Sequence, residues 1–361
     1  MEFSLTEEQR MLQDSVAGYL RDACPIEVVR EAGDTGQTHS QALAQGLTDL
    51  GVNSILIPED FGGVGLGYLE AALIAEALGG VAAPVSYFAN AVMAPLAILH
   101  AGTEEQQEEW LPLIAAGEVR FGVGVTEQIG RRDSSGIKAQ DGKLTGEAMF
   151  VLEGMDADQL IIADQSGALY IVDANQTERT KLKTIDRTRS VAKIVLSDTP
   201  ADLLPGSQGN REPLLQMIDA GRVMLAADSL GAGQKMLDDS IEYAKERKQF
   251  NRVIGSFQAV KHMCAEMAAE LEPCRSMVWY AAHALDSIPD ESRLMACHAK
   301  AHLAEVGKFV ARTATEVHGG MGMTDLLGLH YWFKRIGFDR QLLGAPELVR
   351  EEAARAQGWV S

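Results

Sequence analysis

A group of cationic and amide side chains at residues 243–262 is the first part of the sequence with types and spacing suited to chemistry. The stretch YAKERKQFNRVIGSFQAVKH places Arg247 and Lys248 at the end of a long helical pattern, followed by Asn251, which tolerates the left-handed backbone of a helix end. A guanidinium is a planar fork of donors that matches phosphate oxygens, so Arg247 is a candidate for binding a pyrophosphate. A basic helix terminus that complements the helix dipole explains the same residues. Both interpretations stay open on the residues alone.

A glycine-rich turn lies further along the chain, in TEVHGGMGM. Gly319, Gly320 and Gly322 lack a side chain, so a phosphate or an adenine could approach the backbone closely there. The signal is weak, because many turns between helices need two glycines. His318 precedes the glycines, and a contact at the helix end is its simplest explanation.

His298 and His302 follow Cys297 at a spacing that puts both imidazoles on one helix face. Metal sites with that spacing normally take a further acidic or cysteine ligand from elsewhere. The sequence offers no such ligand, so we expect a solvent-facing or packing role and no metal.

Composition limits the classes of protein to which the chain could belong. A net charge of -19 over 361 residues disfavours nucleic acid as a partner. No apolar run reaches the ~18 residues of a membrane span, and the start, MEFSLTEEQRMLQ, lacks the pattern of a signal peptide. The four cysteines show no paired metal spacing, which suits a reduced protein. We therefore expect a cytoplasmic location and no membrane span.

The elements that must position these residues fall into three blocks. Apolar residues recur every three or four positions from Thr6 to about Gly117, with Thr103 as a candidate N-cap, and again from about Glu212 onward. Between them, runs such as KLTGEAMFVLEG and DQLIIAD are short, β-rich and separated by turn residues. The pattern predicts an α+β fold, mainly α, with an N-terminal helical domain (1–118), a middle antiparallel β domain (119–208) and a C-terminal four-helix-bundle domain (209–361).

Five stretches, in this order along the chain, together resemble the acyl-CoA dehydrogenase family. The resemblance covers essentially the whole chain, and five motifs in register make a chance match improbable. The stretches are IPEDFGGVGLGYLEAALIAEALG, GTEEQQEEWLPLIAAGE, VTEQIGRRD, YAKERKQFNRVIGSFQ and HGGMGM. The resemblance implies a tetramer that binds FAD across a subunit interface. It also implies a reaction in which a carboxylate base removes the α-proton of an acyl-CoA while the flavin accepts the β-hydrogen as hydride.

The half of the family's cofactor site that holds the nucleotide is mostly present. By resemblance, Arg247, Gln249 and Phe250 reach the FAD pyrophosphate of a neighbouring subunit, Gln258 lies about one helix turn further on, and Gly319 and Gly320 stand at the adenine end. Glu316 departs from the glutamine of many members, and an acid is less welcome near phosphates.

The half that holds the flavin ring departs further from the family pattern. Phe150 stands at the family's tryptophan position, and Leu152 stands at a threonine position, where it cannot donate a hydrogen bond to the flavin edge. Gly130-Arg131-Arg132-Asp133 replaces the family's Gly-Ser-Asp. Thr126 remains as a cofactor-binding candidate.

The catalytic base is missing at both positions that the family uses. Leu343 replaces the C-terminal glutamate, and Gly221 occupies the alternative position, ahead of Arg222, a candidate substrate-binding residue. Neither Leu343 nor Gly221 can take a proton, so this chain alone is not expected to dehydrogenate an acyl-CoA.

Two enzymatic interpretations remain, with a third that involves no catalysis. In the preferred one, the chain is a subunit of an FAD-dependent acyl-CoA dehydrogenase whose partner subunit carries the glutamate, with electron-transfer flavoprotein as acceptor. HGGMGMTDLLGLHYWFKR and DRTRSVAKIVLS are similar to base-less subunits of two-gene bacterial dehydrogenases that shorten sterol side chains. In the second, the fold serves a flavin-dependent oxidase or monooxygenase. The third is a scaffold that has lost its cofactor.

Overall fold

The computed structural model describes residues 4–130 and 136–360, which fold as two compact units assembled from separate segments. One unit takes the chain up to Gly36, Ala72–Ala83 and the chain from Arg222 onward. The other takes Gln37–Ala71 and Pro84–Gly221. No helix among the described residues is both long and apolar enough to span a membrane.

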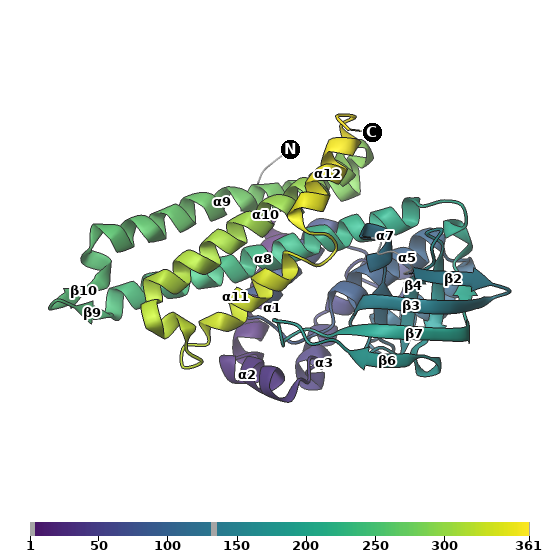
Figure 1. Cartoon of the computed structure of the whole chain (residues 1–361), viewed down its shortest axis with the longest axis horizontal. Coiled ribbons are helices and arrows are strands. Elements are labelled where there is room, and N and C mark those ends of the chain that lie inside the picture. The colour runs from purple at the N-terminus through teal and green to yellow at the C-terminus, as the bar shows by residue number, and fades with distance from the viewer. Residues whose placement is uncertain (1–3, 131–135, 361) are drawn as a thin grey trace. The chain divides into compact units, whose positions relative to one another are not determined.

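The first unit is a helical bundle with a small hairpin at one end. Figure 1 shows α8, α9 and α10 running side by side, with α11 along the same bundle and the β9–β10 hairpin at its tip. Its elements are α1 (Glu7–Ala23), α2 (Ile26–Thr35), α4 (Tyr68–Gly80), α8 (Glu212–Glu246), β9 (Lys248–Gln249), β10 (Arg252–Val253), η6 (Ile254–Ser256), α9 (Gln258–Ser287), α10 (Pro289–His318), η7 (Gly319–Met323), α11 (Leu329–Asp339) and α12 (Pro346–Ala356). Helices α4 and α8 begin in the other unit.

Glycines on α8 let the helices of this bundle approach one another closely. A Cβ on Gly231 would lie 1.9 Å from the carbonyl oxygen of Glu76 on α4, so only glycine fits there. Gly233 faces Leu271 of α9, and Val310 of α10 lies at the edge of contact. These contacts pack α8 against its neighbours.

The second unit combines short helices with a sheet. Thr103 caps α6, because its side chain accepts the N–H of Gln106 while the Gln106 side chain bonds back to the Thr103 N–H, which confirms the predicted N-cap. The helical elements are α3 (Gln41–Asp49), η1 (Val52–Ser54), η2 (Glu59–Phe61), the π-helix η3 (Phe88–Met93), α5 (Ala94–Ala101), α6 (Glu104–Ala115), α7 (Thr126–Ile129), η4 (Ala174–Gln176) and η5 (Pro205–Ser207).

The sheet runs in the order β6-β7-β3-β1-β4-β5-β8, with β2 paired to β3. Its strands are β1 (Phe121–Gly124), β2 (Gly136–Gln140), β3 (Lys143–Leu152), β4 (Gln159–Ala163), β5 (Leu169–Asp173), β6 (Glu178–Lys181), β7 (Val191–Pro200) and β8 (Asp202–Leu203). Apolar side chains from the two longest strands, β3 and β7, and from their neighbours form the core of the sheet, among them Leu144, Leu160 and Ile194.

The predicted order of helices, sheet and helices is confirmed, with one correction within the sheet. β1 and β4 pair in parallel, so the sheet is mixed rather than antiparallel throughout. A parallel pair needs a long connection, and here the β2–β3 hairpin lies between the two strands in the chain. Short alternating runs in the sequence could not reveal which strands become neighbours.

Candidate functional site

The β9–β10 hairpin carries the predicted pyrophosphate-binding residues at the tip of the bundle. Its two-residue turn is Phe250-Asn251, and both residues have positive φ, 52° and 60°, the geometry of the tight turns that join antiparallel strands. Asn251 adopts the left-handed backbone predicted for it. Phenylalanine rarely adopts a positive φ. Phe250 does, and its side chain is 87% exposed. An exposed aromatic ring held in an unfavourable backbone conformation suggests a functional role.

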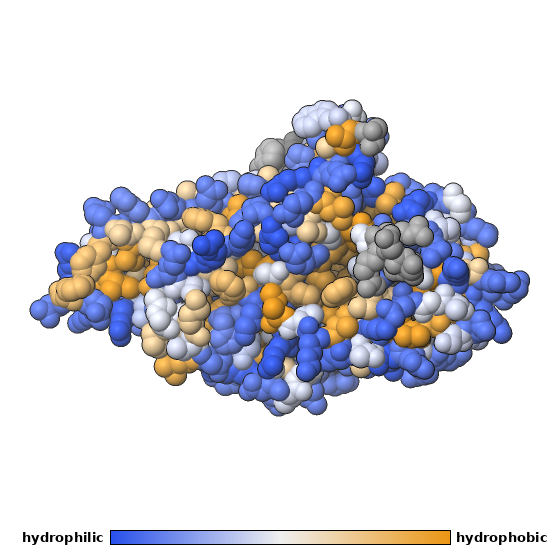
Figure 2. All heavy atoms as spheres, in the orientation of Figure 1, coloured by the Kyte–Doolittle hydropathy of each residue, from blue (hydrophilic) through white to orange (hydrophobic). Residues whose placement is uncertain are grey.

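Arg247, Gln249 and Gln258 all lie on the surface of this region. The backbone of Arg247 is fixed, since its N–H donates to Tyr243 and its carbonyl accepts from Ile254. Its guanidinium forms no hydrogen bond or ion pair with any described side chain. Figure 2 shows hydrophobic surface at this end of the bundle, where Phe250 is exposed. A free cation beside an exposed ring is suited to a ligand outside the chain.

The glycine turn lies against the same end of α8. Gly319 has φ 59°, and a Cβ at Gly319 or at Gly320 would meet nothing within 4 Å, so open space lies over this backbone. His318 is buried with its ring stacked on Tyr243, 4.5 Å between ring centroids, and its Nδ1 lies 2.8 Å from the Ala314 carbonyl oxygen. Tyr243 is one turn before Arg247, so the stack brings the two predicted nucleotide-binding segments together.

Glu316 is exposed on the last turn of α10. It lines a groove of about 440 Å³ between α9 and α10, together with Lys308 and Arg312. The sequence did not single out these two cations. Arg312 lies one turn and Lys308 two turns before Glu316 on the same helix. Lys308 lies 3.9 Å from Glu305, and Glu266 also lines the groove, so its carboxylates outnumber these cations.

The turn between α11 and α12 carries Leu343, which by resemblance stands at the position of the family's base. Leu343 has φ 54° and is buried, and its carbonyl oxygen accepts a hydrogen bond of 2.9 Å from Arg222 Nε. Arg222 also binds both oxygens of Glu352 on α12, at 2.6 and 2.9 Å. Arg222 is 1% exposed, so the predicted substrate-binding guanidinium is engaged within the chain. Gly221 is buried within α8.

Lys300 also holds the turn that carries Leu343. The sequence analysis did not identify this residue. Its buried ammonium donates to the carbonyl oxygens of Asp339 (2.8 Å), Arg340 (3.1 Å) and Gly344 (3.3 Å). Burial, with the nearby Arg222 and Arg340 charges, lowers the pKa of Lys300 to about 7. A lysine between alanines on the buried face of α10, in ACHAKAHL, was the available signal.

The predicted flavin-ring residues lie in the sheet unit. Phe150 sits at an irregularity of the β3–β7 pairing with φ 53°, and Thr126 Oγ1 lies 3.5 Å from its carbonyl oxygen. Glu127 accepts the Met149 N–H at 2.9 Å, which ties α7 to β3. Leu152 is buried. Thr126 and Phe150 are therefore neighbours, and Leu152 adds only apolar surface. Arg131, Arg132 and Asp133 lie outside the described residues.

Glu153, directly after Leu152, is a buried acid that the sequence analysis missed. Its carboxylate accepts backbone N–H groups from Tyr87 (3.0 Å), Phe88 (3.2 Å) and Asn90 (3.3 Å) at the start of the π-helix η3. Burial raises its pKa to about 7, against the lowering effect of those N–H groups and of Arg189. Glu153 thus joins the end of β3 to η3.

His298 and His302 share one face of α10, as their spacing predicted. They line a hollow of about 340 Å³ with Trp359, and Cys297 is buried beneath them within 3.6 Å of Arg222. Among the described residues, no three His, Cys, Asp or Glu side chains are grouped so that they could hold a metal ion.

The residues present fit FAD at its nucleotide end and not at its ring end. At the nucleotide end, an unengaged guanidinium and an open glycine backbone are what a pyrophosphate and an adenine require. At the ring end, Thr126 offers a hydroxyl, but the buried Leu152 has no donor to offer.

Comparison with known proteins agrees with this arrangement. The models of the acyl-CoA dehydrogenase N-terminal and C-terminal domains match residues 6–118 and 212–358. The fold is that of a family of flavin-dependent oxidoreductases that act on acyl-CoA. The chain belongs to the acyl-CoA dehydrogenase family, whose cofactor is FAD.

Several relatives match over nearly their whole length. Acyl-CoA dehydrogenase IpdE2 of Mycolicibacterium smegmatis is 29% identical over 99% of this chain and 100% of its own. A chain of the ChsE4-ChsE5 complex from Mycobacterium tuberculosis is 27% identical, with a TM-score of 0.91 over 100% of both chains. Butyryl-CoA dehydrogenase from Megasphaera elsdenii, at 22% identity and a TM-score of 0.90 over 99% of this chain and 100% of its own, shares the fold.

Proposed function

We propose that this chain is the base-less subunit of a heteromeric, FAD-dependent acyl-CoA dehydrogenase. The observation that carries the proposal is Leu343. It occupies the position of the family's glutamate in a turn whose backbone Arg222 and Lys300 hold in place. Removal of an α-proton needs a basic group within hydrogen-bonding reach, and a leucine offers none. The carboxylate must therefore come from a partner subunit.

The chemistry is α,β-dehydrogenation of an acyl-CoA thioester. FAD, when bound, accepts the β-hydrogen as hydride. This chain supplies binding rather than proton transfer: Arg247, Gln249, Phe250 and Gln258 contact the pyrophosphate of an FAD shared with the partner, and Gly319, Gly320 and Glu316 lie at its adenine end. Thr126 contributes a polar contact at the ring end. Arg222 does not contact the substrate. It supports the turn around Leu343 and affects substrate binding only by holding that turn in place.

The exposed hairpin supports a contribution to a cofactor in another subunit. Arg247 and Phe250 are exposed, although the Phe250 ring meets the Phe257 ring edge-on at 6.1 Å between centroids, and an exposed charge contributes little to the chain's own stability. Both residues are suited to a ligand bound mostly by a neighbour. A heterotetramer of two chain types would place one β9–β10 hairpin at each FAD site that the two subunits share.

Relatives indicate the partner, the acceptor and the substrate. The ChsE4-ChsE5 structure is a complex of two differently named chains, and the Tcur3481-Tcur3483 steroid ACAD, 27% identical with a TM-score of 0.87 over 98% of both chains, is a second. The subunit CarC of the caffeyl-CoA reductase-Etf complex of Acetobacterium woodii is 26% identical over 88% of this chain and 89% of its own. We infer a bulky acyl-CoA, such as one with a sterol side chain, as substrate, electron-transfer flavoprotein as acceptor and a cytoplasmic location.

Co-expression with a neighbouring dehydrogenase-like gene tests this proposal. We expect the chain purified alone to be nearly colourless and the co-purified complex to be yellow with FAD. One FAD per chain in the protein purified alone, together with oxidation of an acyl-CoA, would overturn the proposal.

A further inference from the structure

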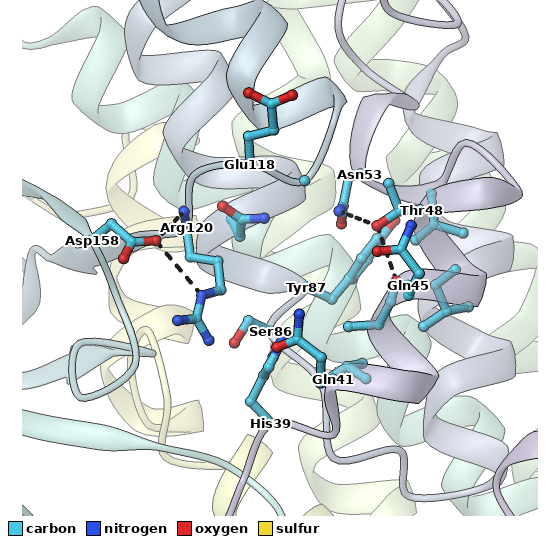
Figure 3. A pocket seen from close by; sticks show the side chains of 16 residues that line it. His39, Gln41, Gln45, Thr48, Asn53, Ser86, Tyr87, Glu118, Arg120 and Asp158 are labelled. Atoms are coloured by element: carbon cyan, nitrogen blue, oxygen red, sulfur yellow. Dashed lines mark hydrogen bonds and ion pairs between the residues drawn. The ribbon is translucent and has the colours of Figure 1, made fainter.

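A polar pocket in the sheet unit has no part in the proposed function. It has a volume of about 250 Å³ and lies between α3, the segment before η3 and the turn before β1 (Figure 3). None of the residues at the family's flavin or base positions lines it. The polar side chains that the argument uses are His39, Gln41, Gln45, Ser86, Arg120 and Asp158.

One edge of the Arg120 guanidinium lies against Asp158, and its other edge faces the pocket. Its backbone N–H donates to Asp158 Oδ2 at 3.0 Å, and its Nε lies 3.7 Å from the same oxygen. Its carbonyl accepts the N–H groups of Asp158 and Gln159, so the main chain is held as well. The two terminal amino groups bind no described residue, and Figure 3 shows the guanidinium extending to the side where Ser86 and His39 lie. A guanidinium fixed in this way presents a fork that matches two carboxylate oxygens.

His39 adds a second group without a partner in the described part of the chain. Its Nδ1 is buried and has no hydrogen bond. Burial, and then the Arg120 charge, lowers the pKa of His39, so the ring is neutral at neutral pH. A buried ring nitrogen without a partner is costly, and a ligand oxygen or hydroxyl in the pocket would satisfy it. The Ser86 hydroxyl lies beside it as a further donor.

Charge and size narrow the class of ligand. Arg120 is partly balanced by Asp158, and Glu118 also lines the pocket, so a monoanion fits here better than a doubly charged phosphate would. The volume of about 250 Å³ corresponds to roughly eight water molecules at about 30 Å³ each. Gln41 and Gln45 come from the opposite wall, on α3, although the Gln45 amide also donates to Asp49. These amides could bind a polar substituent on a ligand with a short carbon chain.

We propose that this pocket is a binding site for a small carboxylate, whose two oxygens bind the terminal amino groups of Arg120 while His39, Ser86 and Gln41 bind the remainder.

Titration of the full-length chain with ¹³C-carboxyl-labelled acetate and lactate, both monoanions, tests the site, with line broadening as the readout. Inorganic phosphate, followed by ³¹P broadening, and ¹³C-glycerol are the comparison probes. We expect saturable broadening of at least one carboxylate. Arg120→Gln should weaken that binding at least tenfold, because it removes a charged hydrogen-bond pair. Arg211→Gln removes the same charge from an exposed site of the same unit and should leave binding unchanged.

A second variant keeps the test decisive if Arg120→Gln does not fold. Ala44→Leu adds bulk to the pocket wall from α3 and leaves the Arg120–Asp158 pair intact, and it should also abolish binding. Equal carboxylate affinity in wild type and in either pocket variant would overturn the proposal. Absence of carboxylate binding, or phosphate or glycerol binding as tightly as acetate and lactate, would overturn it too.

Discussion

Two buried cations, Arg222 and Lys300, and the partly exposed Glu352 hold the turn that carries Leu343. A left-handed backbone costs a non-glycine residue roughly 1–2 kcal/mol, and Leu343 adopts it with its carbonyl bound to Arg222. The sequence identified Leu343 and Arg222 by resemblance. It could not show that Arg222 binds Glu352, because the two residues are 130 positions apart.

Loss of the Arg222–Glu352 pair should destabilise the chain strongly. Arg222→Met leaves the partly exposed Glu352 without its partner and the Leu343 carbonyl without its donor, and an unsatisfied buried acceptor alone costs about 1–3 kcal/mol. Denaturant unfolding measures the loss. Arg355→Met removes an exposed arginine that pairs with Glu351 on the same helix and should cost less than about 1 kcal/mol. Equal losses in the two variants would contradict the structural role of Arg222.

Of the cofactor contacts proposed above, that of the Arg247 guanidinium can be tested most directly. In the reconstituted complex, Arg247→Ala should lower FAD occupancy, because a charged hydrogen bond to phosphate contributes about 1.5–3 kcal/mol. The circular dichroism spectrum should hardly change, since the side chain is exposed. Arg10→Ala, which removes an exposed arginine on α1, is the charge-matched control. If FAD content stays the same in Arg247→Ala, the pyrophosphate site lies elsewhere.

At the scale of elements, periodicity predicted the helices and the β-rich middle of the chain, and Thr103 marked the start of α6. The π-helix η3 and the parallel β1–β4 pair could not be predicted in this way. η3 is fixed by Glu153, a residue more than 60 positions away, and the strand pairing depends on which segments meet after folding. Arg247 and the glycine turn were each recognised, but only the structure reveals the Tyr243–His318 stack that joins them.

The β9–β10 hairpin should tolerate loss of the Phe250 ring but bind the cofactor less well without it. Phe250→Gly relieves a positive φ, so the free energy of unfolding should change by less than about 1 kcal/mol. FAD occupancy of the complex should fall. Phe250→Tyr restores an aromatic ring at the same position and should restore occupancy. A Phe250→Gly complex with full FAD content would show that the ring serves another purpose.

The link between β3 and η3 should make stability depend on pH. The pKa of Glu153 is raised to about 7 in the folded state, so its contribution to stability is fully present below about pH 4.5 and is lost as pH rises to about 7. Relative to Glu153→Gln, the wild type should lose up to about 3 kcal/mol across that window. Urea unfolding of both proteins between pH 5 and 8 measures the difference. A wild-type advantage that grows with pH would contradict the assignment.

At the scale of the whole molecule, the chain has the fold of its family, and we propose that it lacks the family's catalytic base. The residues proposed to bind the nucleotide are exposed, whereas Leu343, at the proposed base position, is apolar and buried. If flavin were already seated in this chain, as in an oxidase or monooxygenase, a restored carboxylate at position 343 would have a ring to work against. If the flavin pocket belongs to the partner, the restored carboxylate would have none.

Acyl-CoA-dependent dye reduction separates these two cases and tests the central claim directly. The samples are the isolated chain, isolated Leu343→Glu, the complex with its partner, and the complex in which the partner's catalytic glutamate is replaced by glutamine. We predict activity in the unmodified complex alone, because a base acts only within reach of the α-proton and opposite a bound flavin. Activity in the isolated chain, or its appearance in isolated Leu343→Glu, would contradict the account.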